Sequence, residues 1–126
     1  MEIVLVVEDN QNNMRLITKL LENEGLQTIK AYSGEEGVRL AMEEKPDLIL
    51  MDIKLPGIDG LEATRQIRAA ENDSHKVPII AITSFAMAGD REQYLEEGFT
   101  GYIEKPIDPF TIIKEIKQIW GKDISP

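Results

Sequence analysis

Half of the residues of this chain that could do chemistry are acidic, and all of them stand directly after short apolar runs. They are Glu8, Asp9, Asp52, Thr83, Ser84 and Lys105. Carboxylates that are packed together repel one another, which raises the pKa of at least one of them unless a cation compensates. Oxygen ligands in a chain without cysteine favour a hard ion, and an open site with few carboxylates suits Mg²⁺. The sequence therefore predicts a magnesium site that includes these carboxylates.

A carboxylate beside Mg²⁺ can attack a phosphoryl group, because the metal shields the approach of the two negative charges. Asp52 could then act as the nucleophile and form an acyl phosphate. Thr83 and Lys105 would hold the remaining phosphoryl oxygens and stabilise the charge of an in-line transfer. We therefore predict phosphoryl-transfer chemistry at Asp52.

Five short apolar runs predict the strands that position these residues. The first, residues 3–7, is β-branched and does not alternate with polar residues, which is typical of a strand covered on both faces. The others are residues 27–30, 48–51, 77–82 and 101–104. Every predicted strand except the second, at residues 27–30, is therefore followed by one or two of the residues that could do chemistry.

Helical periodicity fills the segments between these runs, and start and stop signals mark the helix ends. The first helix ends before Gly25, which we expect in a left-handed conformation. The predicted starts are Ser33 with Glu36, Asp59 with Glu62, and Asp108 followed by Pro109. The fourth helix stops at Gly98 and has a thin apolar stripe of Met87 and Leu95, with Tyr94 at its edge.

Five strands that alternate with five helices predict an α/β fold with a mostly parallel sheet, right-handed crossovers and helices on both faces. In such a sheet the ligand site lies outside the carboxyl ends of the strands. We therefore expect the residues that follow the strands to converge at one edge.

The length, net charge and composition of the chain argue against several classes of function. A length of 126 residues fits one domain, and a net charge of -9 leaves no broad basic surface for nucleic acid or an anionic membrane. No apolar run approaches the roughly 20 residues of a membrane helix. The lack of cysteine and of a secretory signal suits a reducing cytoplasm.

The ordered set of Glu8-Asp9, Asp52, Thr83 and Lys105-Pro106 resembles the receiver domain of two-component response regulators, and in particular the stand-alone receivers typified by the chemotaxis regulator. The resemblance spans nearly the whole chain, so that residues 1–126 would form one receiver domain. It implies strand order 2-1-3-4-5 and a flavodoxin-like fold. It also implies that Asp52 is phosphorylated by a histidine kinase or a histidine phosphotransfer protein, in a reaction that needs Mg²⁺.

The resemblance also implies a role for each metal-site residue. Asp9 and Asp52 would bind Mg²⁺ directly, together with the backbone carbonyl of Lys54. Glu8 would act mostly through water, and it stands where many members of the family have aspartate. Lys54 and Phe85 occupy positions that influence the lifetime of the acyl phosphate in the family.

A second group of residues would sense the phosphoryl group. Thr83 would contact it, Lys105 would pair with it, and the bond between Lys105 and Pro106 would be cis. Tyr102 resembles the aromatic residue that turns inward when Thr83 moves. The surface of the fourth helix, fifth strand and fifth helix would change as a result, and the weak anchoring of the fourth helix suits such a change.

Simpler interpretations of the same residues remain open. Glu8-Asp9 could be a solvated helix cap, Thr83-Ser84 could be a capping pair, and Tyr102 could belong permanently to the core. His75 stands in a polar loop, where we expect neither a phosphodonor nor a metal ligand.

Other functions remain open as well. The chain could be an interaction module that works without phosphorylation, although the intact Asp52 and Lys105 argue against this. It could be a small Mg²⁺-dependent phosphatase, but such enzymes have a second acid where this chain has Lys54. A flavodoxin-like flavin binder would meet an acidic edge that repels the flavin phosphate.

Overall fold

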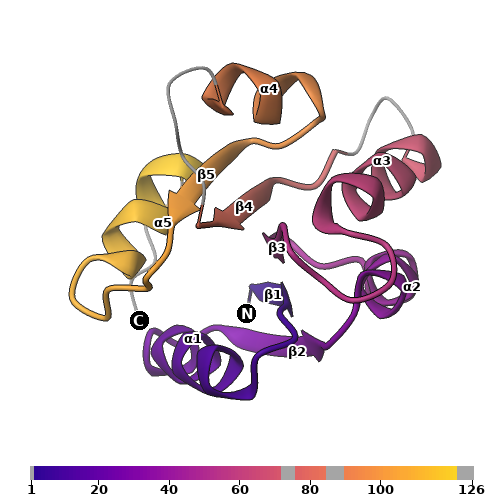
Figure 1. Ribbon diagram of the computed structural model, residues 1–126. Helices are drawn as coiled ribbons and strands as arrows, with labels where there is room; N and C mark the ends of the chain where they lie inside the picture. Colours follow the sequence, from indigo (N-terminus) through magenta and orange to yellow (C-terminus); the bar gives the residue numbers. More distant parts are fainter. Residues whose placement is uncertain (1, 72–75, 85–89, 122–126) are drawn as a thin grey trace.

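The computed structural model describes residues 2–71, 76–84 and 90–121, in which five strands alternate with five helices (Figure 1). The strands are β1 (Ile3–Val7), β2 (Gln27–Ala31), β3 (Leu48–Asp52), β4 (Ile79–Thr83) and β5 (Gly101–Glu104). The helices are α1 (Gln11–Asn23), α2 (Gly34–Glu44), α3 (Gly60–Ala70), α4 (Asp90–Glu96) and α5 (Ile112–Trp120). The predicted residues His75, Phe85 and Met87 lie outside the described ranges.

All strand pairs are parallel, and the strand order is β2-β1-β3-β4-β5, as the resemblance implied. Every residue of β3 and β4 is buried, because helices cover both faces of the sheet. Figure 1 shows α1 and α5 on one face and α2, α3 and α4 on the other. The predicted α/β fold is therefore confirmed.

Side chains alternate between the two faces along each strand, which divides the core into two clusters. One cluster contains Leu48 and Leu50 of β3 and packs against α1 and α5. The other contains Ile49 and Met51 and packs against α2, α3 and α4. This alternation decides toward which helices the residues at the strand ends point.

The helix starts follow local hydrogen bonds, and most of them agree with the sequence prediction. The Ser33 side chain accepts a bond from the Glu36 N–H at 3.1 Å, and Asp59 accepts one from the Glu62 N–H at 2.9 Å. Gly25 has φ +85°, as expected for a residue after a helix C-terminus.

The predicted start of the last helix at Asp108 is wrong. The helix begins at Ile112, after Thr111. The Asp108 carboxylate instead accepts a bond from the Phe110 N–H at 2.9 Å, which stabilises a turn ahead of the helix. The Asp108 carbonyl also accepts a bond from the Ile112 N–H at 3.0 Å, so the aspartate makes cap-like bonds in the turn that leads into the helix.

The prediction for the buried side of α4 is also wrong. Leu95 is 47% exposed, whereas Tyr94 is buried. Tyr94 packs on Phe99 and Tyr102, with ring centroids 5.8 and 5.9 Å away. An aromatic ring therefore anchors this helix, and the leucine faces solvent.

Arg68 of α3 joins segments that are distant in the sequence. Its guanidinium donates to the carbonyls of Gly98 at 2.9 Å and Val77 at 2.7 Å, and it pairs with Glu71 at 2.8 Å. The turn that follows α4 is thus attached to the C-terminal part of α3.

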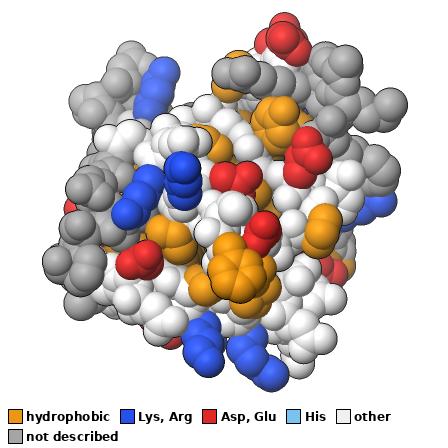
Figure 2. Space-filling model, turned by 90° about the vertical axis from the view of Figure 1, so that its left-hand side faces the viewer, with side chains coloured by type: hydrophobic (Ala, Val, Ile, Leu, Met, Phe, Trp, Pro, Cys, Tyr) orange, Lys and Arg blue, Asp and Glu red, His pale blue; other side chains and the backbone are white. Residues whose placement is uncertain are grey.

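The molecular surface carries its charges in small groups. Figure 2 shows the side of the molecule where α1 and α5 lie, with acidic and basic side chains scattered around a central group of hydrophobic ones. The described residues of this face form no continuous basic area of the kind that binds a phosphate backbone. No helix within the described ranges has both the length and the apolar composition to cross a membrane.

Candidate functional site

The predicted chemical groups meet at the carboxyl ends of the strands. One pocket is lined by all the residues predicted for metal and phosphoryl chemistry: Glu8, Asp9, Asp52, Lys54, Thr83 and Lys105. Carboxylate oxygens of Glu8, Asp9 and Asp52 all lie within 4.8 Å of one another. They come together because β1 and β3 are neighbours in the sheet, with Val7 opposite Met51.

The interpretation of Glu8-Asp9 as a helix cap is wrong. Asn10 caps α1, and its side chain accepts a bond from the Asn13 N–H at 2.9 Å. Glu8 is only 2% exposed, and its Oε2 accepts a bond from the Asn10 N–H at 3.2 Å. The glutamate is therefore turned into the pocket, with one oxygen fixed by the start of the helix.

Lys105 brings a positive charge to the two buried carboxylates. Its Nζ donates to Asp52 Oδ2 at 3.0 Å and lies 3.5 Å from Glu8 Oε1. It follows β5, and its backbone N–H donates to the Thr83 carbonyl at 2.7 Å. The bond from Lys105 to Pro106 is cis, as the resemblance implied.

The alternation of side chains explains which groups face one another. The side chains of Val6, Leu50 and Ile103 face α1 and α5. Two residues further along the chain from each of these stand Glu8, Asp52 and Lys105, which therefore lie on the same face of the sheet. Thr83 continues the row of Ile79 and Ala81, which faces α3 and α4. The threonine therefore borders the pocket from the opposite side of the sheet.

Burial and charge shift the pKa values of this cluster. Burial, followed by the hydrogen bond and the charge of Asp52, raises the pKa of Glu8 to about 7, because Asn10 and Lys105 lower it by less. Burial lowers the pKa of Lys105, but Asp52 and Glu8 outweigh this and leave it above its usual value. The site thus holds more negative charge than one ammonium can balance.

The residues present fit a magnesium ion. Glu8 Oε1 is buried and has no hydrogen-bond partner within the described part of the chain, since Lys105 Nζ is too far away to donate well. The donor set consists of oxygen atoms, and Asp9 is exposed at the mouth of the pocket. Mg²⁺ prefers such a set with open positions for water. A divalent cation would satisfy the unpartnered oxygen and lower the repulsion between the carboxylates.

The hydroxyl of Thr83 has a partner that the sequence did not reveal. Its Oγ1 lies 2.9 Å from the hydroxyl of Tyr94, and both side chains are buried. Tyr102 is half-buried on β5 beside Tyr94. The signal in the sequence was the one aromatic residue of a helix whose only other apolar residue is Leu95, and so little apolar periodicity did not show which side of the helix is buried.

The raised pKa of Glu8 predicts how stability depends on pH when no divalent ion is present. The unfolded glutamate titrates near 4.5 and the folded one near 7, so the folded chain holds more protons between these values. We therefore expect the free energy of unfolding to fall as pH rises from about 4.5 to 7, by on the order of 1 kcal/mol per unit of pKa difference.

Denaturant unfolding in EDTA at several pH values tests this expectation. Glu8→Gln keeps a neutral side chain at every pH, so its stability should lack this component of the pH dependence. Equal pH dependence in the two proteins would show that Glu8 is not protonated in the folded state.

Known proteins are similar to this chain in both fold and sequence. Residues 4–117 match the family model described as the response regulator receiver domain. The chain belongs to this family. It is 47% identical over 118 residues to the polar-differentiation response regulator DivK of Brucella ovis, and the match covers 94% of this chain and 95% of that one.

Solved structures of receiver domains are similar throughout. The receiver domain of sensor histidine kinase PA1611 from Pseudomonas aeruginosa has a TM-score of 0.83 at 39% identity, covering 96% of this chain and 98% of the other. That structure contains a magnesium ion in its active-site cleft. The BeF3-activated N-terminal receiver domain of Klebsiella pneumoniae RstA has a TM-score of 0.82 at 27% identity, covering 96% and 100%. This receiver is therefore a component of two-component signalling.

Proposed function

We propose that this receiver accepts a phosphoryl group on Asp52 from a histidine kinase or a histidine phosphotransfer protein, in a reaction that needs Mg²⁺. The observation that carries the proposal is the position of Asp52. Its carboxylate lies within 4.8 Å of two other carboxylates and accepts a bond from the Lys105 ammonium at 3.0 Å. A buried structural aspartate would not need this surplus of negative charge.

The proposed reaction moves one phosphoryl group from nitrogen to oxygen. A carboxylate oxygen of Asp52 attacks phosphorus and forms a P–O bond, while the P–N bond of the phosphohistidine breaks. The bonding electrons leave with the imidazole nitrogen. The product is an acyl phosphate on Asp52. Water can later attack the same phosphorus, so that the receiver assists both its phosphorylation and its dephosphorylation without being an enzyme in the usual sense.

Each residue of the pocket has a proposed task. Asp9, Asp52 and the Lys54 carbonyl would hold Mg²⁺, with Glu8 acting mostly through water. The bound ion would neutralise charge on the transferred group. Lys105 would give up part of its present contact with Asp52 and pair with one phosphoryl oxygen. The Thr83 hydroxyl would donate a hydrogen bond to a second phosphoryl oxygen. The magnesium ion in the active-site cleft of the similar PA1611 receiver supports a magnesium site in this pocket.

The output would be a change of surface or an onward transfer of the phosphoryl group. The surface formed by α4, β5 and α5 lies beside Thr83, and Tyr102 belongs to it. A downstream protein would recognise that surface after phosphorylation, or a phosphotransfer protein would receive the group. We propose that residues 1–126 work in this way as one receiver domain in the cytoplasm, without direct contact with nucleic acid or membrane.

Incubation with Mg²⁺ and acetyl phosphate or phosphoramidate tests this function. We expect the intact protein to gain the mass of one phosphoryl group, and we expect EDTA to prevent the gain. No gain with Mg²⁺ would overturn the proposal. In that case a partner that binds regardless of phosphodonor would indicate an interaction module, and multiple turnovers on a generic phosphoester would indicate a phosphatase.

A further inference from the structure

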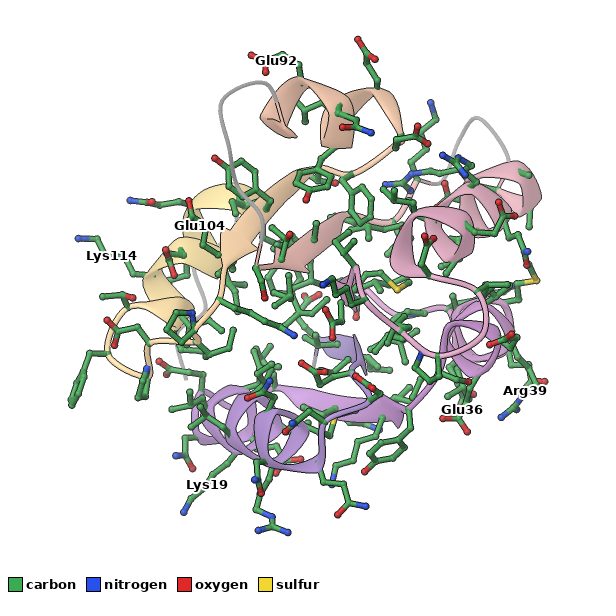
Figure 3. The ribbon with its side chains drawn as sticks, in the orientation of Figure 1. Lys19, Glu36, Arg39, Glu92, Glu104 and Lys114 are labelled. Atoms are coloured by element: carbon green, nitrogen blue, oxygen red, sulfur yellow. The ribbon has the colours of Figure 1, made fainter. Side chains whose placement is uncertain are left out.

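The helix α4 is attached to the core through very few side chains. Among its residues with described side chains, Glu92 to Glu96, only Tyr94 is buried. Glu92 points away from the sheet, as Figure 3 shows, and Leu95 is half-exposed. Among these described side chains, the Tyr94 ring therefore supplies the buried contact of α4 with the core.

The hydroxyl of Tyr94 contacts Thr83, which lines the pocket. The Tyr94 hydroxyl lies 2.9 Å from Thr83 Oγ1, where either group can donate, and the Tyr94 ring packs against the rings of Phe99 and Tyr102. A buried hydrogen bond of this kind defines the orientation of both hydroxyls, because an unpaired buried hydroxyl is unfavourable. Tyr94 thus connects the end of β4 with α4 directly.

The direction of Thr83 makes this bond an obstacle to phosphoryl binding. Asp52 faces α1 and α5, whereas Thr83 faces α3 and α4, and Ile82 rather than Thr83 is opposite Asp52 in the sheet. The threonine hydroxyl therefore has to turn from Tyr94 in order to donate to a group on Asp52. Phosphoryl oxygens only accept hydrogen bonds, so they require the single proton of this hydroxyl.

We propose that Tyr94 is a positioning residue that holds the Thr83 hydroxyl away from Asp52 until a phosphoryl group competes for it, and that this exchange loosens the anchor of α4. The inference rests on the proposed function of Asp52. It assigns to Tyr94 the coupling that the sequence resemblance assigned to Tyr102. By linkage, the hydrogen bond between Tyr94 and Thr83 opposes phosphoryl binding, and phosphoryl binding in turn breaks this hydrogen bond.

The test compares the affinity of single variants for beryllofluoride, a mimic of the phosphoryl group, at saturating Mg²⁺. Tyr94→Phe removes only the hydroxyl, and it destabilises the unliganded state more than the liganded one. We expect it to bind the mimic about fivefold more tightly than the wild type, which corresponds to one ordinary hydrogen bond. In a Thr83→Val background the same change should have no effect, because the shared hydroxyl is absent.

Two further variants make the result specific. Tyr32→Phe removes the hydroxyl of a tyrosine that is 44% exposed, and its affinity should equal that of the wild type. Tyr102→Phe tests the competing assignment within the same aromatic cluster. A Tyr94→Phe affinity that is unchanged or weaker, or a larger gain in Tyr102→Phe, would overturn the inference.

The phosphorylation assay separates this inference from the proposed function. If the wild type takes no phosphoryl group from acetyl phosphate, the proposed function of Asp52 fails and the inference fails with it. If the wild type is phosphorylated and binds the mimic, but Tyr94→Phe behaves identically, only the inference fails. The NMR signals of the Tyr94 ring give a direct second readout, since they should shift on mimic addition in the wild type.

Discussion

Asp52→Asn is expected to take up no phosphoryl group from acetyl phosphate, while the wild type becomes phosphorylated under the same conditions. An amide nitrogen or oxygen is a much weaker nucleophile than a carboxylate, and the variant also replaces one of the three clustered carboxylates with a neutral amide, which binds Mg²⁺ less strongly. The loss should be complete in mass spectra of the intact protein.

The same variant should change the electrostatics of the pocket. Asp52 is a main cause, after burial, of the raised pKa of Glu8, so this pKa should move back toward its ordinary value. Asp47→Asn is a matched control. It also neutralises an aspartate beside β3, but at the opposite end of the strand, where Asp47 accepts a bond from the Ile3 N–H at 2.7 Å. Equal phosphorylation of the Asp52→Asn and Asp47→Asn variants would place the phosphoryl group elsewhere.

Gly60→Ala should destabilise the protein by about 3 kcal/mol or more, as expected when a close backbone contact leaves no room for an added methyl group. A Cβ at this position would overlap the carbonyl oxygen of Asp52 and lie 2.9 Å from the Cα of Ile53. Both are backbone atoms and cannot move aside as a flexible side chain could. The Gly60 N–H also donates to the Ile53 carbonyl at 2.8 Å, which keeps the two segments together.

Urea unfolding measures this effect, and Gly25→Ala is the control. Gly25 has φ +85° but no atom within 4 Å of an added Cβ, so its substitution should show only backbone strain of about 1 to 2 kcal/mol. A Gly60→Ala variant that loses no more stability than Gly25→Ala would contradict the close contact. The Gly60→Ala protein that remains folded should also be phosphorylated more slowly, because the end of β3 has to shift.

The fold could be predicted from the sequence because its strands and caps are locally encoded. The unbroken apolar run of β1 and the Ser33 and Asp59 caps each depend on neighbouring residues alone. The convergence of Glu8, Asp52 and Lys105 followed from one general property of parallel sheets, that functional groups gather at the carboxyl ends. Strand order needed the family resemblance, since local patterns do not determine which strands are neighbours.

The features that could not be predicted depend on tertiary contacts. Asp108 followed by Pro109 has the pattern of a helix start, but the aspartate accepts a bond within a turn and the helix begins later. The orientation of α4 was missed because a helix with one buried ring has no apolar periodicity to read. The partner of Thr83 was missed for the same reason, as Tyr94 reaches it only after α4 has packed on β5.

The guanidinium of Arg68 has a consequence for any motion of α4. It binds the Gly98 carbonyl, and the nearby Arg65 pairs with Glu97 at 2.6 Å, so both groups attach the turn that follows α4 to α3. We expect a helix that is fixed at its C-terminal end to rotate about that end and not to translate along the sheet. Displacement would then be greatest at the end of α4 that comes first in the chain.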